Sequence, residues 1–444
     1  MSGDLRLGAR ETIALVSDAF TELPHADRET APDGPLGWPG YDDSRARAAG
    51  RTGESESVVC GTASVEGTRA VLIAFEFGFL GGSLGERTGD RLEAAYTYAR
   101  EHRLPVVPLV ATGGSRMQEG MLALTQLQRV ARQSALTREA GLPQIAVLRD
   151  PTTGGGWATL GAGADVVLAL PGVQVGFAGS RIRPVNADPA AYTAEAQVAA
   201  GSADAVVAPE RLRETLGRWL RLLTAPSDEP APVPRPLGAT DLPASGWDAV
   251  RRARSPHRPR AARYLDAYFT HRVAIGGDRC GGTDPDGMLC GFGEHAGRTV
   301  AYAAQTGAAT RPAGYRTATR LIRLAERLGI PVLTLVDTPG AANDAEAERQ
   351  GVGAAIAELF GAVATARTPV TTLVIGEGGS GGALALAAPG RTWATPDSYF
   401  SVIAPESAAA ILKRPPEDAE STANQLRIRP QDLADLGLIR TDGP

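Results

Sequence analysis

The chain has 444 residues, 43% of them hydrophobic, which is long for one domain and enough for two buried cores. The formal net charge of −5 argues against a nucleic-acid partner. No run of about 18 apolar residues is present, so no membrane partner is expected. The amino-terminal stretch carries acidic residues without the long apolar core of a signal peptide, and we expect a cytoplasmic protein.

The first predicted α/β motif begins near Pro105, where LPVVPLV has the composition of a buried strand. It is followed by a turn (TGGS), a helix of roughly 20 residues, a second strand (QIAVL) and the glycine cluster of residues 154–156. Continuously apolar strands that alternate with helices are typical of a parallel sheet covered on both faces. The first half is therefore expected to be an α/β domain.

A change in composition separates this half from the rest of the chain. Residues 224–246 contain six prolines, which cannot continue a helix and predict a semi-rigid linker. We accordingly expect a first domain over residues 1–225, a linker over residues 226–246 and a second domain over residues 247–444.

The second half repeats the motif of the first. IPVLTLVDTPGA predicts a strand and a turn, and TPVTTLVIGEGGSGG predicts a later strand that ends in glycines. Pro105 and Gly155 are 50 positions apart, and Pro331 and Gly382 are 51 apart. This match predicts the duplication of a whole domain, so that two α/β domains lie in tandem.

Each glycine cluster follows a strand and opens a segment of good helix formers, GGGWATLGA in one half and GGALALAA in the other. The first N–H groups of a helix have no partner within the helix, and glycine lets a ligand approach them closely. Such groups can stabilise an oxyanion. A single cluster would favour a tight packing turn between strand and helix, but two copies at matching positions favour a functional role.

Other chemistries have little support in the sequence. None of the five histidines lies in a metal-binding motif, and the three cysteines (Cys60, Cys280 and Cys290) are scattered, so no metal site is expected. Ser380 lies in GGSGG, which echoes a nucleophile elbow, but no histidine follows it to activate the hydroxyl. Lys413 is the only lysine, which excludes a GK[ST] phosphate loop, and its surroundings do not resemble a biotin-carrier hairpin.

Several stretches in order along the chain resemble a known family. FEFGFLGGSLGERTGDRL, ATGGSRMQEG, LRDPTTGGG and VGFAGSR resemble the β subunit of the bacterial acetyl-CoA carboxylase carboxyltransferase. SPHRPRAARYLDAYFTHRVAIGGDR, AGYRTATRLIRLAERLGIPVLTLVDTPGA, VIGEGGSGGALAL and YFSVIAPESAAAIL resemble its α subunit. The resemblance covers roughly residues 40–225 and 250–440 and implies a β–α fusion with two tandem crotonase-like domains.

The family resemblance also implies an activity and a set of site residues. A carboxyl group would pass from carboxybiotin, held on a biotin carrier protein and made by a biotin carboxylase, to a short acyl-CoA, with acetyl-CoA the expected acceptor and malonyl-CoA the product. Two backbone oxyanion holes, one in each half, would stabilise the negative charge that develops. The implied catalytic residues are Gly154, Gly155, Gly381 and Gly382. The implied acyl-CoA residues are Gly82, Ser83, Gly113, Gly114, Ser115 and Arg116, and the implied biotin residues are Thr338, Pro339, Gly340, Gly378 and Gly379. The family further implies at least a homodimer with composite sites.

The chain also departs from this family. It lacks the four-cysteine zinc ribbon of the β subunit, so zinc is not expected, and its α-side loops before AGYR and after DTPGA differ. Trp157 stands beside the first glycine pair, where it either fills the core or shortens the acyl pocket. These departures leave two alternatives open. One is a malonyl-thioester decarboxylase, or a transferase to an acceptor other than CoA. The other is a non-catalytic scaffold that binds a carboxylase partner.

Overall fold

The computed structural model describes residues 6–25 and 31–441. Residues 1–5 and 26–30 of the first expected domain and residues 442–444 of the second therefore lie outside the described residues. The chain divides into two compact units, Met1–Thr224 and Ala225–Pro444.

The first unit is built on one mixed sheet. Within the described residues its strands follow the order β1-β2-β3-β4-β5-β6-β8, and β7 pairs with the far end of β5. The strands are β1 (Ala19–Glu22), β2 (Val58–Val65), β3 (Thr68–Phe75), β4 (Val106–Thr112), β5 (Ile145–Thr153), β6 (Val166–Ala169), β7 (Val175–Gly176) and β8 (Ala205–Val206). From β3 onward the pairings are parallel, and every residue of β4 is buried, as a strand covered on both faces requires.

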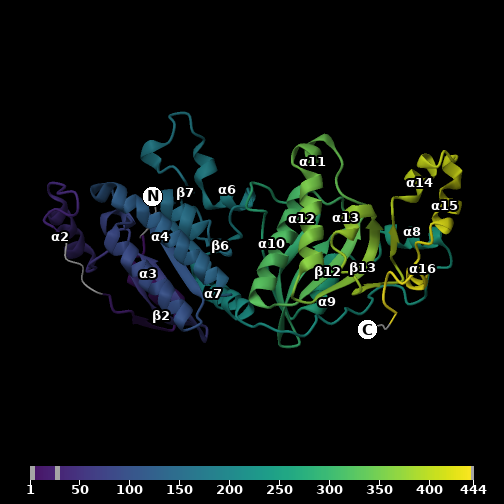
Figure 1. Ribbon diagram of the computed structural model, residues 1–444, viewed down its shortest axis with the longest axis horizontal. Helices are drawn as coiled ribbons and strands as arrows, with labels where there is room; N and C mark the ends of the chain where they lie inside the picture. The colour runs from purple at the N-terminus through teal and green to yellow at the C-terminus, as the bar shows by residue number, and fades with distance from the viewer. Residues whose placement is uncertain (1–5, 26–30, 442–444) are drawn as a thin grey trace. The chain divides into compact units, whose positions relative to one another are not determined.

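Helices cover this sheet. In Figure 1, α3 (Glu86–Glu101) and α4 (Gly120–Glu139) run side by side across one face. The remaining helices are α1 (Ala9–Val16), α2 (Tyr41–Thr52), α5 (Gly154–Gly156), α6 (Ala194–Ala199) and α7 (Pro209–Leu223). The core combines β-branched strand residues such as Val71 and Val110 with Leu92 and Tyr96 of α3, all of them buried. Burial of this apolar area is the main stabilising contribution to the unit.

The second unit repeats the plan. Within the described residues its sheet has the order β14-β13-β12-β11-β10-β9, and β15 pairs with the far end of β13. The strands are β9 (His271–Ala274), β10 (Met288–His295), β11 (Arg298–Gln305), β12 (Val332–Thr338), β13 (Val370–Gly379), β14 (Thr392–Ala394) and β15 (Tyr399–Ser401). The helices are α8 (Gly246–Arg254), α9 (Ala261–Tyr268), α10 (Pro312–Leu328), α11 (Ala345–Arg349), α12 (Val352–Thr365), α13 (Ser380–Leu384), α14 (Pro405–Ile411), α15 (Ala419–Gln425) and α16 (Pro430–Asp435).

Helix α10 shows how the sequence sets the boundaries of these elements. Pro312 occupies its first turn, where the missing N–H carries no cost, and Gly329 ends it in the left-handed conformation with φ of 65°. Its buried face packs against α12, and the two helices lie side by side in Figure 1.

The strands of the two sheets follow matching orders, so the structure shows the expected duplication of an α/β domain.

The proline-rich segment lies along the second unit. The Ser227 N–H donates to the Gly329 carbonyl at 2.8 Å, and the Leu237 N–H donates to the Tyr264 hydroxyl at 3.1 Å. The Tyr268 hydroxyl in turn donates to the carbonyl of Pro232 at 2.8 Å. Prolines still offer their carbonyls as acceptors, so this stretch is fastened to the second unit although it forms no helix or strand.

Candidate active site

Two equivalent turns follow β4 and β12. The Gly114 N–H donates to the Thr112 side-chain hydroxyl at 3.0 Å, and the Gly340 N–H donates to the hydroxyl of Thr338 at 3.2 Å. Thr112 is paired with Thr152 in the first sheet, and Thr338 is paired with Gly378 in the second. The expected turn residues of each half therefore lie next to the end of the strand that carries the glycine cluster.

The same pairings fix which residues of the two glycine clusters correspond. Thr152 and Gly378 are 226 positions apart, and the bridges of Leu84 with Ser115 and of Thr310 with Ala341 repeat that spacing. Gly154 therefore corresponds to Ser380. By the same count Gly155 corresponds to Gly381 and Gly156 to Gly382. The expected first pair, Gly154 and Gly155, is one residue earlier than the equivalent of the second pair.

The backbone conformation agrees with this register. Gly154 has φ of 62° and Ser380 has φ of 59°, so both residues enter the helix from the left-handed region. Glycine adopts this region freely, whereas a serine there is strained. Each cluster then turns into helix, α5 in the first unit and α13 in the second.

The N–H groups at these two helix starts are not equally available. The Gly154 N–H donates to the Phe177 carbonyl at 3.1 Å. Among the described residues, the N–H groups of Gly155 and Gly156 have no acceptor, and neither do those of Ser380, Gly381 and Gly382. Unpaired N–H groups at the start of a helix attract negative charge. Each unit thus presents backbone donors suited to an oxyanion.

The other expected residues of the first unit lie in the turns that follow β3 and β4. Gly113 donates its N–H to the Gly81 carbonyl at 2.9 Å, and Gly114 lies against Gly154. Gly82, with φ of 61°, lies tight against the Ala111 carbonyl. Gly113 and Gly114 thus lie beside the glycine cluster, Gly82 packs against β4, and Ser115 is bridged to Leu84, next to Ser83.

Arg116 lies deeper than an acyl-CoA contact would. Its guanidinium is buried, with 1% of its surface exposed, and forms ion pairs with Glu56 and Glu119. It also donates to the hydroxyl of Ser83 at 3.2 Å, while Tyr41 donates to Glu119 at 2.5 Å. Arg116 therefore links Ser83 to Tyr41 of α2 and to the carboxylates of Glu56 and Glu119. The distant Glu56 could not have been connected to this turn from the sequence motifs alone.

Burial and ion pairing oppose each other at Glu56. Burial raises the pKa of this carboxyl group, but the charge of Arg116 and its hydrogen bonds outweigh burial, so the pKa lies below its usual range. Burial lowers the pKa of the Arg116 guanidinium, but the charge of Glu56 and its hydrogen bonds, together with Glu119, outweigh burial and raise it. Both groups are therefore charged, and removing one would leave the other buried without its partner.

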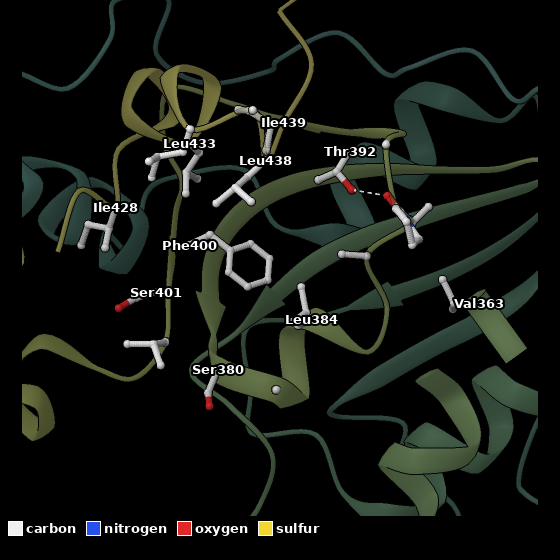
Figure 2. Close-up of a pocket in the computed structure, with 18 of the residues that line it drawn as sticks. Val363, Ser380, Leu384, Thr392, Phe400, Ser401, Ile428, Leu433, Leu438 and Ile439 are labelled. Carbon is white, nitrogen blue, oxygen red and sulfur yellow. Dashed lines mark hydrogen bonds between the residues drawn. The ribbon is translucent and has the colours of Figure 1, made fainter. Parts of the chain in front are cut away.

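In the second unit the start of α13 opens onto an apolar groove of about 770 Å³. Figure 2 shows Leu384, Phe400 and Leu438 around this groove, with Ser380 at one end of it. Gly381 also lines the groove, and a Cβ atom built on it meets no atom within 4 Å. Ser380 and Gly381 at the start of α13 thus border open space that a ligand could enter.

A second buried ion pair supports the turn that follows β12. Asp337, directly before Thr338, accepts hydrogen bonds from Arg258 at 2.6 Å and from Arg260 at 3.3 Å. The Glu377 N–H donates to the same carboxylate at 3.2 Å. This arrangement links the ends of β12 and β13, next to Pro339 and Gly340 on one side and Gly378 and Gly379 on the other.

Trp157 and Ser380 lie at the starts of the two helices, and the structure shows what surrounds each side chain. Trp157 is only 9% exposed and packs with Leu148, Val167 and Val175, so it fills the core of the first unit. Ser380 forms no side-chain hydrogen bond with a histidine in the described part of the chain, so the geometry offers no base for a serine nucleophile.

A search of the described residues for groups of three or more His, Cys, Asp or Glu side chains that could hold a metal ion finds none. Within the same residues, no helix has the length and apolar character needed to cross a membrane.

Comparisons with known families agree with the two units. Residues 40–203 match the model of the carboxyl transferase domain, and residues 242–441 match the model of acetyl co-enzyme A carboxylase carboxyltransferase-like proteins. The acetyl-coenzyme A carboxylase carboxyl transferase subunits beta/alpha of Salinispora arenicola are 41% identical over 98% of this chain and 81% of theirs. A probable biotin-dependent acyl-coenzyme A carboxylase beta3 subunit of Mycobacterium tuberculosis is 35% identical over 91% of this chain and 83% of its own length.

A solved structure gives the same result for the fold. The transcarboxylase 12S structure superposes with a TM-score of 0.79 at 21% identity, covering 98% of this chain and 86% of that one. The expected fold of two tandem crotonase-like domains is confirmed. The matched models, the identity to the beta/alpha proteins and the sheet orders together place this chain in the acetyl-CoA carboxylase carboxyltransferase family, as an enzyme with the β-like and α-like parts fused in one polypeptide.

Proposed function

We propose that the protein transfers a carboxyl group from carboxybiotin to a short acyl-CoA, with acetyl-CoA as the acceptor and malonyl-CoA as the product. The proposal rests on one observation: backbone N–H groups without an acceptor lie at the start of α5 and again at the start of α13, in a chain of this family. Developing negative charge on a thioester oxygen and on a ureido oxygen is what such donors stabilise.

In the first unit we assign the thioester oxygen to the N–H groups of Gly155 and Gly156. Gly154 belongs to the turn, because its N–H is already engaged by Phe177. Gly82, Ser83, Gly113, Gly114 and Ser115 shape the acyl-CoA side around these donors. Arg116 acts through Glu56 and Ser83 and holds the turn in place.

In the second unit we assign the ureido oxygen of biotin to the N–H groups of Gly381 and Gly382. Thr338, Pro339, Gly340, Gly378 and Gly379 form the turn and the strand end beside them. The residues fit this group, because open backbone donors at one end of an apolar groove suit a neutral ring with one polar oxygen. When bound, carboxybiotin supplies the carboxyl group. Lys413, the only lysine, lies outside this set, so we expect the biotin to arrive on a separate carrier protein charged by a biotin carboxylase.

Exposed apolar side chains near both helix starts support assembly of at least two copies. Met117, Met121 and Phe177 are exposed in the first unit, and Leu384, Val402 and Leu438 are exposed in the second. Leu384, Val402 and Leu438 line one groove, and contiguous apolar surface marks association sites in soluble proteins. We propose a homo-oligomer in which another copy covers these faces.

The test is the loss of the carboxyl group from malonyl-CoA with free biotin or biocytin, beside a reaction without biotin. Loss that depends on biotin supports the carboxyltransferase. Equal loss in both reactions would instead indicate the decarboxylase alternative. No loss in either, with no measurable affinity for acyl-CoA, would contradict the proposal and turn attention to other thioesters and to the scaffold alternative.

A further inference from the structure

Two polar side chains lie behind the start of α13 with atoms that have no hydrogen-bond partner. Gln305, the last residue of β11, and Tyr315, in the first turns of α10, are both fully buried. Neither the carbonyl oxygen of the Gln305 side chain nor the Tyr315 hydroxyl has a hydrogen-bond partner among the described residues. A buried polar atom without a partner is destabilising, so a core built only for stability would not keep two of them.

Both side chains contact Gly382. The Gln305 amide nitrogen donates to the Gly382 carbonyl at 3.1 Å. A Cβ atom on Gly382 would lie 2.5 Å from the Tyr315 hydroxyl and 2.6 Å from the Ala341 nitrogen. The phenol therefore occupies the space beside Gly382, between the first turn of α13 and the turn that follows β12.

The chemistry around Tyr315 agrees with a rigid, neutral phenol. Burial is the largest cause of the raised pKa of Tyr315 and outweighs the opposite effect of the nearby Thr310 hydroxyl. Thr310 does not lie in hydrogen-bonding geometry with Tyr315, but it accepts a hydrogen bond from Gln305 at 3.4 Å. Gln305, Thr310 and Tyr315 thus form one buried polar cluster that contacts α13 at Gly382.

Among the described residues of the first unit, no such cluster lies at the corresponding place. The strand pairings match Gln305 with Phe75, at the end of β3, and the shared spacing of 226 positions matches Tyr315 with Gly89. Phe75 is fully buried, and Gly89 has no side chain. The buried polar cluster of Gln305, Thr310 and Tyr315 therefore distinguishes the second unit from the first and does not follow from the shared fold.

We propose that Gln305 and Tyr315 are positioning residues that hold the Gly382 peptide and the first turn of α13 in the orientation that presents the N–H groups of Gly381 and Gly382. Gln305 fixes the Gly382 carbonyl, and Tyr315 keeps the helix start at its distance from Ala341. This inference rests on the proposed function, because it assigns the two side chains to the biotin-side donors.

The test compares Tyr315→Phe and Gln305→Met with Tyr302→Phe as the matched control. Tyr302 is a buried tyrosine of the same unit whose hydroxyl donates to the Val273 carbonyl at 3.3 Å. Amide hydrogen exchange over residues 383–388 reports the order of α13 without requiring activity, since the Ala385 N–H donates to the Gly381 carbonyl at 3.0 Å. Urea unfolding and biotin-dependent loss of carboxyl from malonyl-CoA complete the comparison.

We expect exchange over residues 383–388 to be about fivefold faster or more in both variants and unchanged in Tyr302→Phe. Tyr315→Phe should unfold at the same urea concentration or a higher one, because it removes an unpaired buried hydroxyl, while kcat falls about tenfold or more and KM for malonyl-CoA stays within about twofold. Unchanged exchange in both variants would overturn the proposal. A loss of activity in Tyr315→Phe that merely tracks a loss of stability would also overturn it. If the wild-type protein shows no biotin-dependent activity, the proposed function fails, while the exchange data still decide whether these residues position α13.

Discussion

Gly154 and Ser380 occupy the same position in the two repeats and share a left-handed backbone, with φ of 62° and 59°. Both follow the last residue of a strand that pairs in parallel with its neighbour, and both begin the helix that carries the unpaired N–H groups. One repeat uses the residue that suits this conformation and the other uses a serine. The strain at Ser380 therefore belongs to the second unit alone.

Exchange of these two residue types should have opposite effects on stability. Left-handed backbone costs a non-glycine residue roughly 1–2 kcal/mol, and replacing that residue with glycine removes this cost. Part of the resulting stabilisation is lost, because glycine has greater conformational freedom in the unfolded chain. We expect Ser380→Gly to raise the free energy of unfolding by about 0.5–1 kcal/mol and Gly154→Ser to lower it by at least as much. Urea unfolding of the two variants measures both. Destabilisation by Ser380→Gly would contradict the assignment of strain.

Much of this register could have been read from the sequence. LPVVPLVATGGS and IPVLTLVDTPGA begin 226 positions apart, and QIAVLRDPTTGGG and VTTLVIGEGGSGG keep that spacing. The sequence interpretation matched glycine with glycine, and its first pair therefore begins one residue before the structural equivalent of its second pair. A constant spacing, without regard to residue type, aligns Gly154 with Ser380.

Other parts of the site depend on contacts that no local pattern reveals. The two tandem α/β domains follow from apolar strands and turn residues, which are local signals. Glu56 reaches Arg116 across 60 positions, and Arg258 reaches Asp337 across 79. Such ion pairs are set by tertiary packing, so the sequence motifs assigned Arg116 to the ligand, although its guanidinium points into a buried network.

Two neighbouring glycines of the second unit should respond differently to alanine. A Cβ atom on Gly381 meets no atom within 4 Å and would project into open space beside the groove, whereas one on Gly382 would clash with Tyr315 and Ala341. We expect Gly381→Ala to keep the stability of the wild type and to lose about 10²-fold or more in kcat, because it obstructs the donors. Gly382→Ala should lose both stability and activity. Full activity of Gly381→Ala would argue against α13 as the biotin-side site.

Trp157 should act through stability rather than substrate choice. It is buried among Leu148, Val167 and Val175, and truncation of a buried tryptophan costs about 3–5 kcal/mol. We therefore expect Trp157→Ala to unfold at a much lower urea concentration and Trp157→Phe to be milder. The ratio of kcat/KM for acetyl-CoA to that for propionyl-CoA should stay within about twofold in Trp157→Phe, since a change of one methylene in a pocket is worth 10-fold or more. A large change in that ratio with normal stability would instead place Trp157 at the acyl pocket.

The exposed apolar residues of the groove give a prediction about assembly. Val402 and Leu438 are 72% and 61% exposed, and both line the groove beside α13. If another copy covers this face, a charge there would be buried without a partner. We expect Val402→Glu and Leu438→Glu to shift the protein toward monomer in sedimentation velocity, with unchanged circular dichroism. Leu242→Glu is the control, because Leu242 is 54% exposed and does not line the groove. A wild-type protein that is monomeric at micromolar concentration would contradict the proposed oligomer.

The Glu56–Arg116 pair predicts how the first unit responds to acid. The pKa of Glu56 is lower in the folded state than in the unfolded chain, so the unfolded state binds the extra proton as the pH falls. The contribution of the pair to stability is therefore complete above the unfolded pKa of about 4.3 and is lost as the pH falls through the folded value. Urea unfolding followed by tryptophan fluorescence from pH 7 to 3 should show this loss in the wild type. Glu56→Gln should be less stable at pH 7, because Arg116 then stays buried without its closest carboxylate, and its stability should depend less on pH in the acid range. Parallel pH profiles for the two proteins would show that Glu56 is not the group that titrates.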